Sequence, residues 1–417
     1  MSLAYLSNYF PSLTETFIYR EVIELKRRGI EVATYSLRRP DPSGISKESL
    51  PLHSGTYYLL PVTPSRLLGS HLGFFLRHPL KYFRAYLSMI YGTHVRGKDR
   101  FRSLMHFGEG VVLAEKMRED GVTHIHAHYA SQAASVARVV HLLTGIPYSF
   151  TGHAHDIWHD RLLIPEKLSE AMFVTTCSDV GRCSLLGQAR QDVAGKVHVV
   201  YHGLDLNSFP FSKNGEGRER NLVLSVGRLT PQKGFPDLIR ACVVLKERGL
   251  GFRCVIIGEG EERQEIERLI KSAGVEKEVK LKGAVTQEQI KDYYRKAWVF
   301  ALPCVDTTDG NRDGIPNVLM EAMAMGVPVV TTSNSGQSEL IRDGVHGLLV
   351  PTHSPAEIAD SIMRLCEDTH LRDKIVTEAR KRMEQDFDNR KTIEPLLGLF
   401  ERFVFDRKCG FLMAKNG

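Results

Sequence analysis

Paired cysteines are absent from this sequence. Its 7 cysteines are odd in number, scattered, and never separated by only two residues, which argues against a disulfide framework and against a zinc site. No uninterrupted apolar run is long enough to cross a bilayer, and the residues after Met1 lack the basic and apolar regions of a secretion signal. We therefore expect a protein of the reducing cytoplasm whose contact with any membrane is peripheral.

Acidic residues are missing from Leu50 to Lys98, although the whole chain is nearly balanced, with 55 basic and 49 acidic residues. The formal net charge of +6 is too small for a chain of this length to indicate nucleic acid as a partner. Within the acid-free segment, Arg and Lys alternate with Leu, Phe and Tyr. This pattern fits docking at an anionic membrane leaflet, and it also fits a pair of ordinary helices beside a binding cleft.

The chain has 417 residues, more than one hydrophobic core usually supports, which favours two domains. Short apolar runs alternate with helical patterns, as in parallel sheets built from βα units. Proline, glycine and charge concentrate at 208–220, which is typical of a linker. The predicted class is α/β, with Rossmann-like domains at 1–207 and 221–385 and a helical segment at 386–417.

The stretch RDGIPNVLMEAMAMG at 312–326 indicates an anion-binding helix start. Pro316 suits the first helical position, because the N–H that proline lacks would have no partner there. The next residues would then present unpaired N–H groups that attract phosphate: Asn317, Val318 and Leu319. Asp313 and Glu321 would repel phosphate, so we expect them to accept hydrogen bonds from hydroxyls. A ligand that carries both groups is a sugar nucleotide.

Two cations lie in the motif VGRLTPQKG at 226–234, on a loop between a strand and a helical pattern. Arg228 could bind a diphosphate as a bidentate fork and Lys233 could bind it as a point charge. The alternative is a solvated basic loop, because most Lys and Arg side chains are exposed. The motif alone leaves both interpretations open.

Histidines and an aspartate follow a predicted strand in FTGHAHDIW at 150–158. Zinc is the weaker interpretation, because the set has no fourth ligand and lacks the spacing of a metalloprotease helix. His153 and His155 could instead donate to sugar hydroxyls or stabilise a leaving group. A third interpretation is a capped loop with Asp156 at the N-cap of the following helix.

Two further motifs have simple structural interpretations. IGEGEER at 257–263 contains Gly-Glu-Gly after a strand, but it lacks the third glycine of a dinucleotide fingerprint, so a tight turn is favoured. FPSLTETF at 10–17 spaces Ser12 and Glu15 as in a capping box, which is compatible with a ligand-facing loop.

Taken in chain order, the motifs form a specific pattern. They are SLTETFI, HAHYA, FTGHAHD, HGLD, VGRLTPQKG, IGEGE, DGIPNVLMEAMAMGVPVV and SGQSELIRDGVHGLLV. This order resembles the GT4 family of retaining glycosyltransferases over nearly the whole chain, and within it the bacterial exopolysaccharide enzymes of the colanic acid or amylovoran type. The resemblance implies the GT-B fold, in which two Rossmann-like domains face an interdomain cleft. The first domain would bind the acceptor, the second would bind the nucleotide sugar, and a C-terminal helix would cross back to the first.

The resemblance also assigns roles. Arg228 and Lys233 match residues that hold the donor diphosphate, and Glu321 matches an acid that contacts the nucleotide ribose. His153 matches a histidine beside the transferred sugar. Asp313 matches an acid that contacts hydroxyls of that sugar, but glutamate is commoner there, and the shorter aspartate requires a closer hydroxyl or a bridging water.

The candidate residues fall into three sets. The catalytic candidates are Asp313, His153, Arg228 and Lys233. The donor-binding candidates are Arg228, Lys233, Gly314, Ile315, Pro316, Asn317, Val318 and Glu321. The acceptor-side candidates are Thr14, Glu15, His128 and Asp156.

The implied reaction moves a hexosyl unit from a nucleotide diphosphate sugar to a hydroxyl of a glycan or polyprenyl-linked acceptor, with retention of anomeric configuration. No Asp-x-Asp motif lies near the candidate loops, so we expect neither a metal nor another cofactor. The alternatives are a sugar-nucleotide epimerase or a phosphorylase of the same fold, and a non-catalytic module that binds nucleotide sugars. The sequence does not identify the base, the hexose, the linkage or the oligomeric state.

Overall fold

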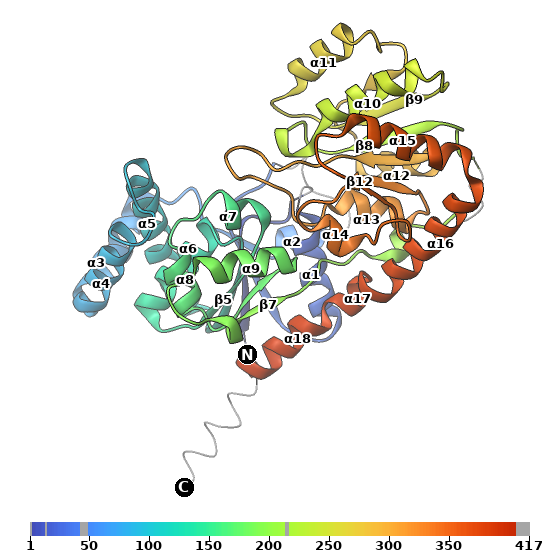
Figure 1. Cartoon of the computed structure of the whole chain (residues 1–417). Helices are drawn as coiled ribbons and strands as arrows, with labels where there is room; N and C mark the ends of the chain where they lie inside the picture. The colour runs from blue at the N-terminus through green and yellow to red at the C-terminus, as the bar shows by residue number, and fades with distance from the viewer. Residues whose placement is uncertain (1, 13–14, 42–48, 213–216, 406–417) are drawn as a thin grey trace. The chain divides into compact units, whose positions relative to one another are not determined.

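The structure is a computed structural model that describes residues 2–12, 15–41, 49–212 and 217–405. The chain forms two compact units (Figure 1). The first unit contains the residues up to His202 together with those from Thr392 onward, and the second unit runs from Gly203 to Lys391. Each unit contains one parallel sheet flanked by helices.

Seven parallel strands form the sheet of the first unit, in the order β3-β2-β1-β4-β5-β6-β7. The strands are β1 Ser2–Tyr9, β2 Val32–Arg38, β3 Thr56–Tyr58, β4 Val122–His128, β5 Tyr148–Gly152, β6 Val174–Thr176 and β7 Val197–Val199. The strand order reverses between β1 and β4, and in open sheets of this kind ligands bind beyond the carboxyl ends at such a point.

Helices connect these strands and cover the sheet. They are α1 Thr16–Arg27, α2 Leu50–Ser54, α3 Pro64–Arg77, α4 Pro79–Ile90, α5 Lys98–Glu119, α6 Gln132–Thr144, α7 Ala154–Trp158, α8 Ile164–Glu170 and α9 Asp179–Gln188. α6 ends at Gly145, whose φ of 81° is the left-handed conformation that glycine adopts without strain. Figure 1 shows α3, α4 and α5 side by side at one edge of this unit.

The second unit has six parallel strands in the order β10-β9-β8-β11-β12-β13. The strands are β8 Leu222–Val226, β9 Arg253–Ile257, β10 Val279–Leu281, β11 Val299–Leu302, β12 Val329–Thr332 and β13 Leu348–Val350. Its helices are α10 Phe235–Glu247, α11 Arg263–Ser272, α12 Gln287–Lys296, α13 Asn317–Ala324, α14 Gln337–Leu340, α15 Pro355–Glu367 and α16 Thr369–Asp386. Here the order reverses between β8 and β11, whose following loops carry the predicted donor residues.

Helical structure continues to the end of the described chain, through α17 Asn389–Thr392, α18 Glu394–Phe400 and a π-helical turn at Glu401–Phe405. Leu396 and Phe400 of α18 are buried in one cluster with Leu3 of β1 and Ile18 of α1. The C-terminal segment therefore contributes to the core of the first unit.

The second unit begins before the linker predicted at 208–220. The N–H of Leu204 donates to the carbonyl of Phe387, and Phe209 is 1% exposed. These contacts hold residues 203–212 to the second unit, although their proline and charge are typical of a linker.

Three helix starts differ from the sequence predictions. Pro316 is the N-cap of α13 rather than its first helical residue, because its ψ of 122° is extended. The stretch after His153 is the short helix α7 rather than a loop, and its N-cap is His153, not Asp156. Glu15 is the N-cap of α1, so the capping box predicted from Ser12 to Glu15 does not form in that register.

None of the helices in the described part of the chain combines the length and the apolar character that spanning a bilayer would require.

Candidate functional site

The centre of the donor-side candidates is an ion pair between Lys233 and Asp313. Lys233 Nζ lies 2.7 Å from Asp313 Oδ2, and the side chains are only 11% and 18% exposed. The thiol of Cys304 donates to the same carboxylate oxygen at 3.3 Å. Burial lowers the pKa of Lys233, but Asp313 outweighs it and raises the pKa above its ordinary value. Lys233 is therefore a cation held beside the loop that follows β11.

Close backbone approach fixes the loop that carries these cations. Gly258 has a φ of 153°, and a Cβ there would collide with the carbonyl oxygen of Gly227. The N–H of Leu229 donates to the carbonyl of Glu259 at 2.9 Å. The Gly-Glu-Gly motif is thus the tight turn that the sequence predicts, and it positions Arg228 on the adjoining loop.

Gly234 closes the same loop against the next strand. Its φ of 67° is left-handed, and a Cβ there would collide with the carbonyl oxygen of Pro303. The N–H of Val305 donates to the carbonyl of Gln232 at 3.0 Å. Two loops that are distant in sequence are thereby joined just where Lys233 meets Asp313.

The start of α13 offers fewer free donors than the sequence predicts. The N–H of Leu319 donates to the carbonyl of Pro316 at 3.0 Å, which leaves Asn317 and Val318 as the first-turn N–H groups without an intrahelical partner. Gly314 and Ile315 precede them, and a Cβ on Gly336 would lie 2.8 Å from Ile315 Cγ1. This packing against the loop after β12 fixes the entry to the helix.

Glu321 lies one turn into α13 and is 8% exposed. The hydroxyl of Tyr294 donates to its Oε2 at 3.0 Å. Burial raises the pKa of Tyr294, and the neighbouring carboxylate raises it further. Arg228, in contrast, is exposed at the beginning of the loop after β8. The second unit thus presents Arg228 to solvent and holds Lys233, Asp313 and Glu321 in place.

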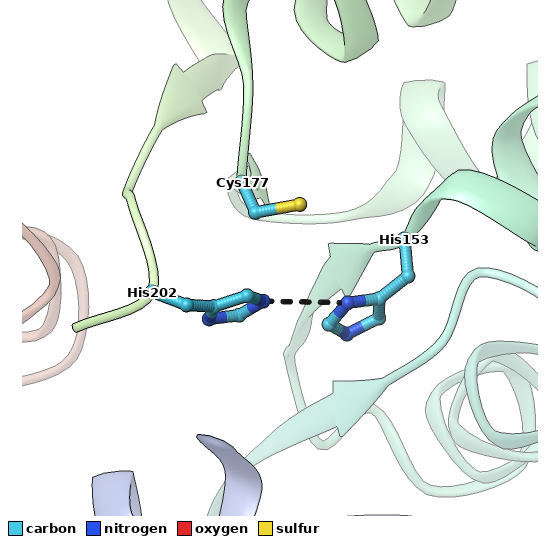
Figure 2. Close-up of side chains that lie close together, drawn as sticks. All are labelled: His153, Cys177 and His202. Atoms are coloured by element: carbon cyan, nitrogen blue, oxygen red, sulfur yellow. Dashed lines mark hydrogen bonds between the residues drawn. The ribbon is translucent and has the colours of Figure 1, made fainter. Parts of the chain in front are cut away.

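In the first unit, His153 lies in a buried cluster of aromatic rings and imidazoles. His128 Nδ1 is 3.4 Å from His153 Nε2, and His202 Nε2 is 3.5 Å from His153 Nδ1. The ring of Phe17 stacks on His202 with centroids 4.3 Å apart and contacts His153 at 4.9 Å. Figure 2 shows the rings of His202 and His153 facing each other, with the sulfur of Cys177 near both.

A carboxylate orients the far end of this cluster. Glu21 Oε1 is 3.2 Å from His128 Nε2 and accepts the hydroxyl of Tyr5 at 2.6 Å. Although burial raises the pKa of Glu21, His128 more than compensates and lowers it to about 2. Glu21, His128 and His153 therefore form a chain of hydrogen-bonding groups that begins on α1 and ends at the N-cap of α7.

Burial keeps His153, at the end of that chain, neutral. It lowers the pKa of His153 well below the ordinary value, and His202 and His128 lower it further. Burial also lowers the pKa of His202, to about 4. Both rings are thus neutral at physiological pH and can donate or accept a hydrogen bond.

The acceptor-side candidates have different surroundings. His128 and Asp156 are both 0% exposed. The oxygens of Asp156 accept the N–H of His153 at 2.9 Å and the N–H of Ala130, so Asp156 joins α7 to the loop after β4. Glu15 is half-buried at the N-cap of α1, and Thr14 lies outside the described residues.

Two groups in the described chain have the donor types of a metal site. The ligand atoms of His153, Cys177 and His202 all lie within 4.8 Å of one another, as do those of Glu21, His126 and His128. Imidazole and thiolate suit zinc. Neither group was predicted from the sequence, because each combines residues from segments that lie far apart along the chain.

Sequence reasoning missed several residues at the two sites: Glu21, His202, Tyr294 and Cys304. One signal was available, since the alternating histidines of β4 place three imidazoles on one face of a strand: His124, His126 and His128. All three are buried, and Ser149 and Thr151 are the hydrogen-bond partners of His124 and His126. The residues that complete the network carry no local motif.

Known proteins similar to this chain place it in a family. A family model described as "Glycosyl transferases group 1" matches residues 208–382. WcaL of Salmonella typhimurium, named for colanic acid biosynthesis, is 30% identical over 72% of this chain and 70% of its own length. The chain belongs to the group 1 glycosyl transferases. Another member, the amylovoran biosynthesis glycosyltransferase AmsK of Erwinia amylovora, is 28% identical over 97% of this chain and 100% of AmsK.

Solved structures confirm the GT-B fold of this glycosyl transferase. HepE of Anabaena in complex with UDP and glucose has a TM-score of 0.70 at 18% identity, covering 96% of this chain and 100% of HepE. Sucrose-phosphate synthase of Thermosynechococcus elongatus has a TM-score of 0.73 at 17% identity, covering 96% of this chain and 99% of its own. The predicted GT4-type family and the predicted fold class are thus both confirmed.

Proposed function

We propose that this chain is a retaining hexosyltransferase that uses a nucleotide diphosphate sugar and acts in exopolysaccharide or cell-surface polysaccharide biosynthesis. The acceptor is a hydroxyl of a glycan or of a lipid-linked oligosaccharide. The names of AmsK and WcaL support the biosynthetic setting, and the UDP and glucose in the HepE structure support a nucleotide sugar as donor.

The observation that carries the proposal is the buried pair of Lys233 and Asp313 close to the start of α13. A donor diphosphate would replace Asp313 as the partner of Lys233, because it brings two negative charges to the positive end of a helix. Asp313 would then be free to accept hydrogen bonds from hydroxyls of the sugar. The same two groups thereby provide the phosphate contact and the sugar contact.

The reaction breaks the bond between the anomeric carbon and a diphosphate oxygen, and it forms a bond from that carbon to the acceptor oxygen on the same face. Arg228, Lys233 and the first N–H groups of α13 would stabilise the negative charge that develops on the diphosphate. No covalent nucleophile is needed, and the acceptor proton passes to the departing diphosphate.

His153 has a more limited role in this scheme. Its lowered pKa makes it a weak proton acceptor, so we assign it a hydrogen bond to a hydroxyl of the transferred sugar rather than the role of general base. Glu21 and His128 would hold the ring in the required orientation, as partners of a functional histidine commonly do.

Initial rates with candidate donors test the proposal. A thermal-shift screen of UDP-, GDP- and ADP-sugars first identifies the donor, since a ligand that binds only the native state raises its apparent stability. We expect turnover of that donor to require a hydroxyl acceptor. Donor turnover without acceptor would favour the epimerase, dependence on inorganic phosphate would favour the phosphorylase, and binding without turnover would favour a non-catalytic module.

Metal independence is part of the proposal. We expect activity to survive EDTA, because cationic side chains and the helix start supply the charge that a metal would otherwise provide. Full loss of activity with EDTA, and its return with zinc, would refute this; His153, Cys177 and His202 would then be the first residues to replace.

We also propose a cytoplasmic location with peripheral contact at an anionic membrane. Large apolar side chains are exposed on α3 and α4, including Leu68 at 70%, Leu76 at 68% and Leu80 at 85%. Basic side chains accompany them: Arg77, Lys81 and Arg84. Apolar contact and attraction to anionic lipid would act together. Liposome flotation at low salt, with and without anionic lipid, tests this, and failure to float would remove it.

A further inference from the structure

A large basic cavity lies within the first unit. It has a volume of about 1110 Å³ and is lined by the segment from Tyr91 to Arg102, by residues of α7 and the loop after it, and by Arg190. None of the candidate donor or acceptor residues lines it. The motif FTGHAHDIW contributes His155, which the proposed transfer reaction does not use.

Positive charge dominates the lining. Six cationic side chains outnumber two carboxylates there: Arg96, Lys98, Arg100, Arg102, Arg161 and Arg190 against Asp99 and Asp160. Arg102 forms ion pairs with both carboxylates, at 2.6 Å from Asp160 and 3.4 Å from Asp99. In the described part of the chain, no carboxylate lies within 4.0 Å of Arg96, Lys98, Arg100 or Arg161. This uncompensated charge favours an anionic ligand.

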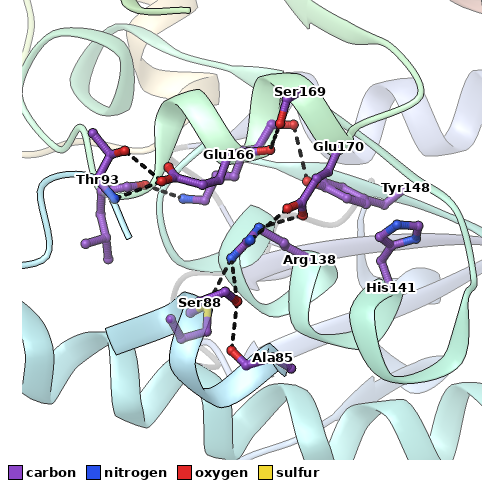
Figure 3. A network of polar contacts seen from close by, with 12 residues as sticks. Ala85, Ser88, Thr93, Arg138, His141, Tyr148, Glu166, Ser169 and Glu170 are labelled. Carbon is purple, nitrogen blue, oxygen red and sulfur yellow. Dashed lines mark hydrogen bonds and ion pairs between the residues drawn. The ribbon is translucent and has the colours of Figure 1, made fainter. Parts of the chain in front are cut away.

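The cavity wall is held by a buried polar network (Figure 3). Glu166 of α8 accepts the N–H of Thr93 at 2.9 Å and its hydroxyl at 2.6 Å. Arg138 of α6 pairs with Glu170 at 2.7 Å and reaches Ser88 near the end of α4 at 3.4 Å. The turn that carries the basic residues is therefore anchored to the core of the unit.

One short helix joins this cavity to the histidine cluster. His153 is the N-cap of α7 and faces His128 and His202, whereas His155 and His159 line the cavity. Residues four apart lie on the same face of a helix, and the two rings have centroids 5.0 Å apart. From His153 to His159, α7 rises about 9 Å, a distance that a short glycan can bridge.

Exposed apolar side chains lead to the cavity from two helices. Along α4 they recur at helical spacing: Leu80, Phe83 and Leu87. Tyr91, the residue after the end of α4, continues this spacing, is 72% exposed and lines the cavity. On α5 a second group follows the basic residues: Phe101 at 69%, Leu104 at 42% and Met105 at 45%. Exposed large apolar side chains that gather on neighbouring helices are typical of a binding surface.

We infer that this cavity binds the diphosphate of a lipid-linked acceptor, with its hydrocarbon chain along α4 and α5 and its glycan directed toward His153. A ligand with a compact anionic head and a long apolar tail matches both features, whereas a free polysaccharide or a nucleic acid would leave the apolar residues uncovered. This inference rests on the proposed transferase function, because it identifies the class of acceptor.

Binding of farnesyl diphosphate by the full chain tests the inference. The background is Lys233→Ala, which removes the diphosphate contact proposed for the donor. The cavity variant adds Arg96→Ala, Arg100→Ala and Arg161→Ala, all on exposed side chains. The matched control adds Arg77→Ala, Lys81→Ala and Arg84→Ala, which remove the same charge from α3 and α4.

We expect the cavity variant to bind farnesyl diphosphate at least about tenfold more weakly than the background protein, because hydrogen bonds to charged groups are among the strongest contacts. The control should change the affinity by less than about twofold, since none of its three residues lines the cavity and salt screens exposed charges that do not contact the ligand. Equal loss in both variants, or no binding to the background protein, would overturn the inference.

Two further ligands test the contributions of the hydrocarbon chain and of the diphosphate one at a time. Farnesol lacks the anion and inorganic pyrophosphate lacks the chain, so each should bind more weakly than farnesyl diphosphate. Equal affinity for farnesol or for pyrophosphate would contradict a lipid diphosphate as the occupant. A failure of the transferase proposal would be seen separately, as the absence of donor turnover by the unmodified chain.

Discussion

The two units assemble their candidate sites in different ways. In the second unit, Lys233 and Asp313 stand on two loops, each of which carries a recognisable motif. In the first unit, Glu21, His128 and His153 come from a helix, a strand end and a helix cap, and none of them is close to another in sequence. The second site is built on backbone geometry, and the first on a buried network of side chains.

This difference has consequences for robustness. Loop conformation in the second unit depends on glycines that permit close approach, so the addition of a single methyl group can disrupt it. The first unit depends on buried ionisable groups, so its stability and activity should respond to pH and to loss of a hydrogen-bond partner. The following changes test the contrast, starting with the largest expected effect.

Replacement of Lys233 by Ala should lower turnover by about a hundredfold or more, because it removes a donor aimed at the leaving diphosphate. Asp313→Asn should act similarly, through the sugar. Steady-state rates measure both, and circular dichroism checks that the fold persists. Lys246→Ala, which removes a 45% exposed lysine of the same unit, is the matched control and should retain full activity. Turnover close to wild type in Lys233→Ala would contradict the role of the pair.

Gly258→Ala should destabilise the second unit by about 2–3 kcal/mol, because its Cβ collides with the Gly227 carbonyl in a conformation that L-residues rarely adopt. Hydrogen exchange in β8 and β9 measures the change locally. Gly251→Ala, where a Cβ has no atom within 4 Å, is the control. If hydrogen exchange in β8 and β9 were equally slow in both variants, the proposed dependence of the loop on close backbone approach would be wrong.

Glu21→Gln should lower kcat about tenfold and leave donor affinity unchanged, because it weakens the orientation of His128 and hence of His153. Glu31→Gln, an exposed residue just beyond α1, provides the control. A fall in donor affinity with unchanged kcat would indicate a structural role for Glu21 instead.

His106 of α5 should make the first unit sensitive to acid. Burial lowers its pKa to about 3, so the unfolded chain takes up a proton first as pH falls below about 6.5. The stabilisation is therefore complete above that pH and is lost progressively down to about pH 3, with a slope of up to about 1.4 kcal/mol per pH unit. Hydrogen exchange in α5 and α6 at pH 6.5 and 5 measures it.

The His106→Gln variant should reduce that slope, while α10 of the second unit serves as the internal reference. An unchanged slope in α5 and α6 would show that His106 does not control the acid response.

The sequence predicted much of the second unit, because its information is local. The alternation of short apolar runs with helical patterns correctly predicted a parallel sheet flanked by helices, and the motif around Arg228 and Lys233 lies on the loop that was expected. Errors there were small: Pro316 caps α13 instead of starting it, since the extended ψ of a proline is not visible in composition.

The first unit was less predictable, because its contacts are distant in sequence. The partnership of Glu21 with His128 depends on α1 packing beside β4, and His202 reaches His153 from beyond β7. One interpretation of the sequence made Asp156 an N-cap, but His153 is the N-cap, and the Asp156 carboxylate accepts N–H groups from His153 and Ala130 instead. The alternation of histidines in β4 is the one sequence pattern that could have predicted this network.

The central claim is that the second unit holds the departing diphosphate through Lys233 and the start of α13. A crystal structure with the nucleoside diphosphate selected by thermal shift tests it directly. The account predicts that phosphate oxygens contact Lys233 Nζ and the N–H groups of Asn317 and Val318, with Asp313 displaced from Lys233. A diphosphate bound elsewhere, with the ion pair intact, would contradict it.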